Sequence, residues 1–339
     1  MNKNLKSFTL RQLGEIVEKP YNSIQIYRWI WKKGVDRIEE FSDISKRLRK
    51  KLIDEGYFVG NIGEKFRINS SDGSVKFVFE DGYEAVYMPE KNRNTVCVSS
   101  QLGCNLKCKF CATGLLGFRR NLMAWEIADQ VLQISKKLNK KITNVVFMGM
   151  GEPLLNFENV KQAIRIMTSH IGLNIGAKHI TISTSGIVPK IYELANFDRR
   201  VKLAISLHSA IEEKRIKIMP IAKAYSLREI KEALIYYLEK QRLRITIEYI
   251  HLKGFNDTDE DIYELRKFIR GIDCKINIIP YNKVDYFDWE APNEEDVYNF
   301  YDKLKKILDN VVITIRWSKG RDIYGACGQL GYQLVHNAK

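Results

Sequence analysis

The sequence Cys97-Val-Ser-Ser-Gln-Leu-Gly-Cys104-Asn-Leu-Lys-Cys108-Lys-Phe-Cys111-Ala-Thr-Gly114 decides how the rest of the chain is interpreted. Four of the six cysteines of the chain fall in these eighteen residues, and three have the spacing C-x3-C-x2-C. Three close thiolates can hold three irons of a [4Fe–4S] cluster and leave the fourth iron open. Structural zinc is the alternative, but zinc normally takes four ligands and the spacing of Cys97 is unusual for a fourth.

Composition predicts a soluble globular protein. The 339 residues are 45% hydrophobic and 28% charged, and this length suits one large domain with a small appendage. The sequence has no apolar run of about 18 residues, so it predicts no transmembrane helix. The N-terminus lacks the apolar core of a signal peptide. We therefore expect a cytoplasmic protein whose cysteines are metal ligands, catalytic thiols or core residues rather than disulfides.

The charge balance favours a polyanionic partner. Lys and Arg total 55 against 41 Asp and Glu, which gives a net charge of +14 and a pI of about 9.3. Such an excess is typical of proteins that bind RNA or DNA, although some proteins are merely basic. A predicted helix near residues 45–55 is a candidate RNA contact or a plain solvated face. It carries a cluster of five cations: Lys46, Arg47, Arg49, Lys50 and Lys51.

Hydrophobic periodicity divides the chain into four parts. Residues 1–60 show helical spacing, with Thr9 as a plausible N-cap, and form a basic helical domain for RNA contact. Residues 61–90 alternate apolar and polar residues around two Asp-Gly turns, which predicts a short antiparallel β unit. Residues 91–322 form the main domain, and residues 323–339 form a C-terminal loop.

Strands and helices alternate through the main domain, which predicts a parallel sheet. We expect strands at 95–99, 144–148, 179–184, 203–207, 245–250, 276–280 and 312–317. We expect helices at 124–137, 160–169, 227–240, 258–270 and 294–308. A doubly wound sheet would also fit, but we favour an α/β fold with a partial (β/α) barrel. The unusual residues all follow strand C-termini, where a barrel keeps its active site.

A second motif, Phe147-Met-Gly-Met-Gly-Glu-Pro-Leu-Leu-Asn156, follows the second of these strands. Glycines after a buried strand let the backbone approach a ligand closely, but Gly-x-Gly alone also occurs in tight turns. This motif lies one β-α unit after the cysteine loop, and the combination is much more specific than either glycine pattern or turn alone. Together the two motifs resemble the radical SAM superfamily, whose members bind a [4Fe–4S] cluster and S-adenosylmethionine (SAM).

The resemblance covers nearly the whole chain. Further matching segments follow in the family's order: Ile182-Ser-Thr-Ser-Gly186, Ile205-Ser-Leu-His208, Cys274-Lys-Ile-Asn-Ile-Ile-Pro280 and Ala326-Cys-Gly-Gln-Leu330. Together these segments resemble the RlmN/Cfr family of radical SAM RNA methyltransferases. Gly-Glu-Pro153, followed by Leu-Leu-Asn156, favours the branch that methylates adenine carbon 2. The carbon-8 branch typically has Gly-Glu-Ala.

The resemblance implies a set of cofactor ligands. Cys104, Cys108 and Cys111 would hold one [4Fe–4S] cluster. The residues implied to bind SAM are Gly151, Glu152, Ser183, Ser206, Leu207, His208 and Asn282. Cys274 matches no role, so we expect it to be structural.

The resemblance also implies a mechanism that uses two SAM molecules per turnover. Cys327 would become an S-methylcysteine intermediate, although a lone cysteine without the motif is more often a buried core residue. A radical derived from the second SAM would activate this methyl group, which would then bond to the adenine. Glu84 would accept the ring proton, although strand alternation alone favours a solvent-facing carboxylate. Cys97 would resolve the adduct through a transient disulfide with Cys327.

The implied substrates are an adenine of the 23S rRNA peptidyl-transferase centre and the adenine 3′ of the anticodon in some tRNAs. The reaction needs an electron donor such as flavodoxin. We expect a monomer that does not bind a membrane. Two alternatives stay open, a carbon-8 methyltransferase of 23S rRNA and a non-catalytic, zinc-binding RNA-binding protein.

Overall fold

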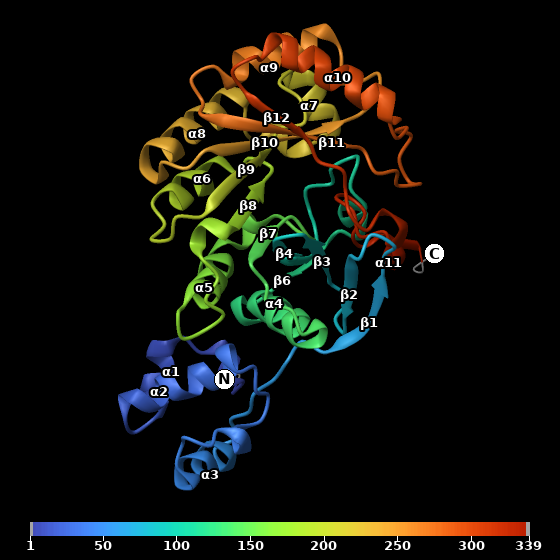
Figure 1. Ribbon diagram of the computed structural model, residues 1–339. Helices are drawn as coiled ribbons and strands as arrows, with labels where there is room; N and C mark the ends of the chain where they lie inside the picture. Colours follow the sequence, from blue (N-terminus) through green and yellow to red (C-terminus); the bar gives the residue numbers. More distant parts are fainter. Residues whose placement is uncertain (1–2, 337–339) are drawn as a thin grey trace.

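One curved sheet of ten strands organises the structure, a computed structural model that describes residues 3–336 (Figure 1). The strand order is β1-β2-β3-β4-β7-β8-β9-β10-β11-β12. The first three pairs are antiparallel and the later pairs are parallel. The bounds are β1 Glu64–Asn69, β2 Val75–Phe79, β3 Glu84–Glu90, β4 Arg93–Cys97, β7 Asn144–Phe147, β8 Ile180–Thr184, β9 Lys202–Ser206, β10 Ile245–His251, β11 Cys274–Pro280 and β12 Val312–Ile315.

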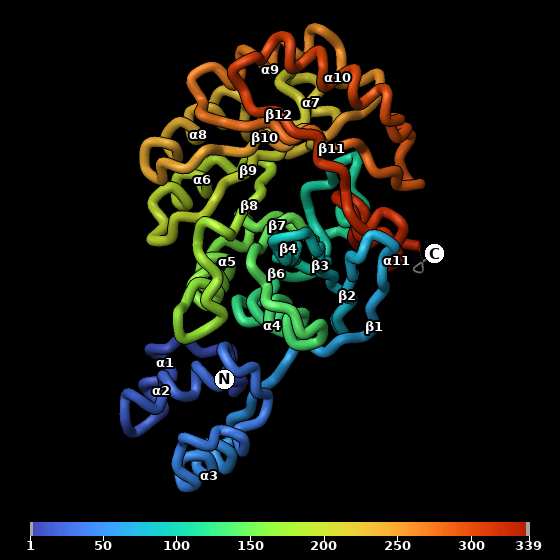
Figure 2. Tube along the Cα trace, in the orientation of Figure 1, coloured from blue at the N-terminus to red at the C-terminus, as the bar shows by residue number. Residues whose placement is uncertain are grey.

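The predicted parallel sheet is confirmed. All seven predicted strands are present, and each begins and ends within two residues of its predicted bounds. Within residues 3–336, β1 and β12 each have one neighbouring strand, so the sheet is open and the predicted partial barrel is confirmed. The backbone trace curves around a central space, with the helices of the main domain outside it (Figure 2).

The parallel strands separate an apolar face from a polar one. Ile245 and Ile247 of β10 belong to the apolar core, whereas the alternate residues Thr246 and Glu248 line a hollow on the other face of the sheet. We call this space the sheet hollow. Other residues that line it are Thr95, Cys97, Thr181, Lys202, Lys275, Asn277, Arg316 and Cys327. The inside of this open barrel is therefore polar and available for chemistry.

Helices connect the parallel strands, and all five predicted helices are present. Their bounds are α4 Ala124–Leu138, α5 Phe157–Thr168, α8 Leu227–Gln241, α9 Asp259–Ile269 and α10 Glu294–Ile307. Side chains at Ser226, Thr258 and Asn293 cap three of them, which satisfies backbone N–H groups at the helix start. The sequence did not predict the short helices α6 Val188–Ala195, α7 Glu212–Ile218 and α11 Tyr332–His336. No helix within residues 3–336 is long and apolar enough to span a bilayer.

The N-terminal part is helical, as predicted, and lies at one end of the molecule beside α4 and α5 (Figure 1). Its helices are α1 Leu10–Ile16, α2 Pro20–Tyr27 and α3 Lys46–Asp54. Thr9 caps α1 through a reciprocal pair of bonds with Gln12. Lys6 joins this part to the main domain because its Nζ lies 2.8 Å from Asp129 Oδ1 of α4, with both side chains fully buried.

The antiparallel strands continue the main sheet through β4, and the C-terminal segment covers part of them. The expectation of a solvent-facing Glu84 is wrong, because this residue is 1% exposed. The face that alternation assigned to solvent is covered by a segment about 250 residues later in the chain, where Gly331 donates a backbone hydrogen bond to Glu84. A local pattern cannot anticipate a cover from so far along the sequence.

Candidate active site

The cysteine loop begins directly after the short strand β5 (Gln101–Gly103). Cys104 donates a backbone hydrogen bond of 3.0 Å to Gly117 O, and Cys111 donates one of 3.2 Å to Cys108 O. Gly103 has φ +73°, and a Cβ there would lie 1.7 Å from Gly117 O. Glycine is therefore required at this position, since any side chain would break the turn that presents Cys104.

The three loop cysteines line one cavity, which we call the cysteine hollow. Other residues that line it are Met148, Gly151, Glu152, Ser183, Ser206, His208, Glu248, Arg316 and Cys327. These residues come from the ends of β7, β8, β9 and β10 and from the C-terminal segment. The structure therefore brings most of the residues that the sequence singled out into one cavity, at the C-terminal ends of parallel strands.

Glu152 is held by backbone donors from two β-α units. Its Oε1 accepts from Leu154 N at 3.0 Å, and its Oε2 accepts from Ser185 N at 2.9 Å. The backbone N–H of Glu152 donates to the side chain of Gln101 at 2.9 Å. Burial raises the pKa of this carboxyl above its usual value, and the Ser185 and Leu154 donors oppose that shift. The result is a rigid carboxyl group that faces the cavity near the cluster cysteines.

Ser183, Ser206 and His208 continue the rim of the cysteine hollow. The hydroxyl groups of Ser183 and Ser206 lie 3.4 Å apart on adjacent strands. His208 is buried, and burial lowers its pKa to about 3, so its ring is neutral at pH 7. Its Nδ1 accepts a hydrogen bond from Ile250 N at 3.1 Å, which leaves the proton on Nε2.

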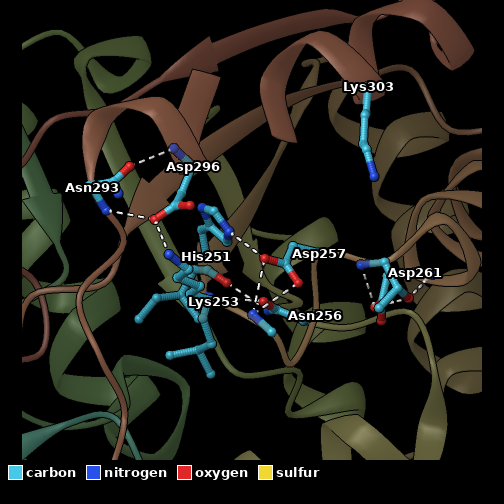
Figure 3. Close-up of polar contacts among 12 residues, drawn as sticks. His251, Lys253, Asn256, Asp257, Asp261, Asn293, Asp296 and Lys303 are labelled. Carbon is cyan, nitrogen blue, oxygen red and sulfur yellow. Dashed lines mark hydrogen bonds and ion pairs between the residues drawn. The ribbon is translucent and has the colours of Figure 1, made fainter. Parts of the chain in front are cut away.

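Asn256 holds the strained turn at His208. The backbone of His208 has φ +60°, which is unusual for a residue with a side chain. Asn256 donates from Nδ2 to the carbonyl groups of His208 and Ile250, both at 2.7 Å. Figure 3 shows Asn256 next to Asp257, whose Oδ2 lies 3.0 Å from His251 Nε2. Sequence reasoning missed Asn256, because no spacing rule connects it to a turn 48 residues earlier.

Leu207 and Asn282 lie apart from the cavity lining. Leu207 is fully buried in the apolar core. Asn282 donates from Nδ2 to Ser318 Oγ at 2.9 Å and to the backbone O of Cys327 at 3.1 Å. In this structure Asn282 therefore positions the C-terminal segment.

Cys327 lines both the cysteine hollow and the sheet hollow, whereas Cys97 lines only the sheet hollow. The segment around Cys327 is bonded to the cysteine loop, with Ala112 N donating to Gly328 O at 2.7 Å. No disulfide joins the two thiols. Burial, together with a smaller contribution from the neighbouring Cys327, raises the pKa of Cys97 to about 12, although the charge of Arg316 opposes this shift. The two cysteines thus share one environment although 230 residues separate them.

Arg316 is a functional candidate that sequence reasoning missed. It lies in both hollows, with Nη1 3.1 Å from Met148 Sδ and 3.9 Å from Glu248 Oε2. The charges of Cys327, Glu248 and Cys97 all favour its protonated form. A guanidinium in this position favours the thiolate form of Cys97.

The donor chemistry of the cysteine loop fits an iron–sulfur cluster. Burial raises the pKa of Cys104 to about 12 and raises the pKa of Cys108 and Cys111, so these thiols need a bound cation to ionise. Arg215 is fully buried nearby, and its Nη1 has no hydrogen-bond partner among the described residues. A buried, incompletely paired guanidinium suits an anionic thiolate-ligated cluster. No group of three His, Cys, Asp or Glu side chains in residues 3–336 is placed to hold a single metal ion, whereas in a four-iron cluster each thiolate binds its own iron.

Cations of the N-terminal helices lie on the surface. The side chains of Arg47 and Lys50 on α3 are 80% and 77% exposed. Each has an acidic partner, Glu18 for Arg47 and Asp54 for Lys50. Exposed pairs of this kind contribute little stability and exchange readily with phosphate groups. The face remains available to a polyanion.

Comparisons with known proteins identify the family of the chain. Residues 98–269 match the model of the radical SAM superfamily, and residues 2–57 match the ribosomal RNA large subunit methyltransferase N-terminal domain. The chain is 45% identical to the probable dual-specificity RNA methyltransferase RlmN of Clostridioides difficile (strain 630), with 96% of each chain covered. The protein of the same name from Dictyoglomus turgidum is 44% identical, with 98% of each chain covered.

A solved structure agrees over the full length. The crystal structure of a radical SAM methyltransferase from Sphaerobacter thermophilus matches with a TM-score of 0.91 and 34% identity, covering 98% of this chain and 100% of that one. Radical SAM proteins bind a [4Fe–4S] cluster and SAM, so the family implies both cofactors here. From these matches, the chain belongs to the RlmN family of radical SAM methyltransferases.

Proposed function

We propose that this protein methylates carbon 2 of adenine in 23S rRNA and in tRNA, with Cys327 as the methyl carrier. The names of the relatives from Clostridioides and Dictyoglomus support dual RNA specificity. The proposed targets are an adenine of the peptidyl-transferase centre and the adenine 3′ of the anticodon in some tRNAs. The excess of 55 cationic over 41 anionic residues suits both substrates.

One observation carries this proposal, namely the location of Cys327 between two hollows. On one side it meets the cavity of the three cluster cysteines, and on the other it meets Cys97. A carrier needs access both to the methyl source and to the thiol that releases it. Few other functions account for a partly buried thiol at such a junction.

The cluster and two SAM molecules, when bound, supply the methyl group and a one-electron route to a carbon radical. Cys104, Cys108 and Cys111 would hold the cluster, and Gly151, Glu152, Ser183, Ser206 and His208 would orient SAM. Leu207 and Asn282 remain proposed contacts of SAM, through backbone groups or after a rearrangement of the C-terminal segment.

The residues of the chain then complete the transfer. Methylated Cys327, after loss of one hydrogen atom from its methyl group, bonds through that carbon to adenine carbon 2. The adduct loses the ring proton to Glu84 and one electron, which the oxidised cluster, when bound, would accept. Cys97 then attacks the sulfur of Cys327, so that an S–S bond forms as the C–S bond breaks and the released carbon takes up a proton. The Cys97–Cys327 disulfide requires two electrons for the next turnover.

We propose one role for each of the four parts of the chain. Residues 1–60 contact RNA, 61–90 carry the proton acceptor, 91–322 hold the cofactors, and 323–339 present the carrier. We propose a cytoplasmic monomer that takes electrons from a donor such as flavodoxin and does not bind a membrane. Residues 337–339 lie outside the described part of the chain.

Replacement of Cys97 tests the proposal. In Cys97→Ala, the adduct forms but cannot be resolved, so a covalent protein–RNA species accumulates on denaturing gels. Cys274→Ala is the matched control, because Cys274 is also buried but starts β11 away from both hollows. Continued turnover of Cys97→Ala without an adduct would refute the resolving role.

Mass spectrometry of the modified nucleoside tests the ring position. We expect 2-methyladenosine in both RNA classes, and 8-methyladenosine alone would refute the carbon-2 assignment. Iron and sulfide analysis after anaerobic purification tests the cluster. Stoichiometric zinc in a colourless protein would instead support the non-catalytic alternative, which family membership disfavours.

A further inference from the structure

Lys76 is a buried cation that the mechanism above does not use. It lies on β2, is fully buried, and places its Nζ 4.0 Å from Oε2 of Glu84 on β3. In the antiparallel register Glu84 lies opposite Val78, and Val78 is two residues after Lys76 on β2. The two charged side chains therefore leave the same face of the sheet as diagonal neighbours.

The C-terminal segment meets this pair on both sides of Cys327. Gly331 N donates to Glu84 Oε2 at 3.1 Å. Lys76 Nζ donates to Gln333 Oε1 at 3.1 Å and to Tyr324 O at 3.5 Å. The loop that carries Cys327 thus rests on Lys76 and Glu84 at its two ends, which couples the position of the carrier to the position of the carboxyl group.

One oxygen of this pair is left without a partner. Glu84 Oε1 is buried and accepts no hydrogen bond from any described residue. Buried polar atoms are normally paired, and this unpaired oxygen belongs to the proposed proton acceptor, where it has the capacity to take up a proton. Burial raises the pKa of Glu84, and the charge of Lys76 and the Gly331 donor act in the opposite direction.

We propose that Lys76 is a positioning residue for Glu84, which keeps the carboxylate ionised and leaves Oε1 free for the carbon-2 proton of adenine. This inference rests on the proposed function. In the step itself the C–H bond breaks, its electron pair stays with the adduct, and the proton bonds to Oε1. Lys76 then keeps its charge beside Gln333 and Tyr324, so the buried cation is not left without acceptors. The hollow next to Glu84 is also lined by other titratable groups: Lys65, Tyr324, Tyr332 and His336.

The test compares Lys76→Met, Lys76→Arg and wild type as cluster-loaded enzymes in single turnovers with 23S rRNA fragments. Methionine keeps the length and removes the charge, whereas arginine retains the charge. We expect Lys76→Met to slow RNA methylation about 10- to 100-fold. Methylation of Cys327, read as the mass gain of the intact protein with SAM, stays unchanged. The pH midpoint of RNA methylation rises in Lys76→Met and returns toward wild type in Lys76→Arg.

Substrate adenine deuterated at carbon 2 sharpens the test. If Lys76 supports proton removal, a primary isotope effect appears or grows in Lys76→Met, and the protein–RNA adduct accumulates. Lys6→Met is the matched control, because Lys6 is also fully buried and paired with a buried carboxylate, Asp129, away from Cys327. We expect it to lose stability without any change of pH midpoint or isotope effect.

Three results would overturn the inference. One is an unchanged pH midpoint and isotope effect in Lys76→Met, as in the control. Another is loss of Cys327 methylation in Lys76→Met, which would mean that Lys76 only holds the loop of Cys327 in place. The third is failure of Lys76→Arg to recover activity while it folds as wild type. If Lys76→Met does not fold, Lys76→Gln takes its place. Absence of 2-methyladenosine from the wild type would refute the proposed function itself, which is a separate outcome.

Discussion

Two fully buried lysines pair with buried carboxylates in this protein, and the two pairs differ in completeness. Lys6 lies 2.8 Å from Asp129 Oδ1, which also accepts from Gln133 at 3.1 Å, and Ile62 N donates to Oδ2 at 3.1 Å. Lys76 lies 4.0 Å from Glu84 Oε2, and the other oxygen of Glu84 has no described partner.

The difference is the one expected between a structural ion pair and the functional pair that we propose. Both pairs are buried, so burial does not distinguish them. A pair in which both carboxylate oxygens accept hydrogen bonds holds two elements together, here the N-terminal segment and α4. A pair with one unpaired oxygen keeps hydrogen-bonding capacity for the proposed reaction. Completeness of hydrogen bonding is therefore the property that the following experiments test.

Glu84→Gln should have the largest effect. Methyl transfer to RNA is expected to fall about 10²- to 10⁴-fold, because the amide cannot accept the ring proton. Stability should fall less than in Lys6→Met, because Lys76 retains Gln333 and Tyr324 as acceptors. Single-turnover assays and urea unfolding measure the two quantities, and a normal methylation rate would contradict the role of Glu84.

Lys6→Met should cost about 3–5 kcal/mol of unfolding free energy, because it leaves the Asp129 charge buried and uncompensated. Cys327 methylation should be unchanged at temperatures where the variant is folded. Adding Asp129→Asn should recover part of the loss in a double-mutant cycle. A loss below about 1 kcal/mol would mean that this pair is not the structural one.

The pH dependence of stability should differ between wild type and Glu84→Gln. The folded-state pKa of Glu84 is raised above its ordinary value of 4.5 by burial. Its contribution to stability is therefore fully present below pH 4.5 and is lost as the pH rises through the folded-state pKa. Measured by urea unfolding across this window, wild type should lose stability relative to Glu84→Gln, and parallel curves would contradict the raised pKa.

Two glutamine substitutions should have the smallest effects. Gln133→Ala removes one donor to Asp129 and should cost about 1 kcal/mol of stability without affecting methylation. Gln333→Ala removes an acceptor from Lys76 and should slow methylation by less than about tenfold, with little loss of stability. If Gln133→Ala slowed methylation and Gln333→Ala lowered stability instead, the distinction between the two ion pairs would be wrong.

Sequence patterns predicted the elements with strong periodicity. The seven parallel strands and five long helices were found because apolar runs and helix caps are local signals. The helices α6 and α7 were missed because seven or eight residues show too little periodicity. The solvent exposure of Glu84 was predicted wrongly, since the segment that covers it begins about 240 residues later.

The residues of the candidate site likewise fall into those that the sequence identified and those that only the structure identified. Residue spacing singled out Cys104, Cys108 and Cys111, and the family resemblance implied that Cys97 and Cys327 act as a pair. Arg215, Arg316, Asn256 and Lys76 carry no motif of their own. Their importance lies in what they contact, and those contacts join residues from 8 to 257 positions apart in the chain.

The sequence by itself determined the order of strands along the chain, the spacing of the three proposed cluster ligands and the resemblance to the family, because spacing and periodicity are properties of neighbouring residues. Only the tertiary structure decided that Cys97 and Cys327 share a hollow, that Glu84 is buried, and that Lys76 lies 4.0 Å from one of its oxygens while the other has no partner among the described residues. Burial, charge pairing and hydrogen-bond completeness depend on segments that folding brings together, and no local pattern encodes them.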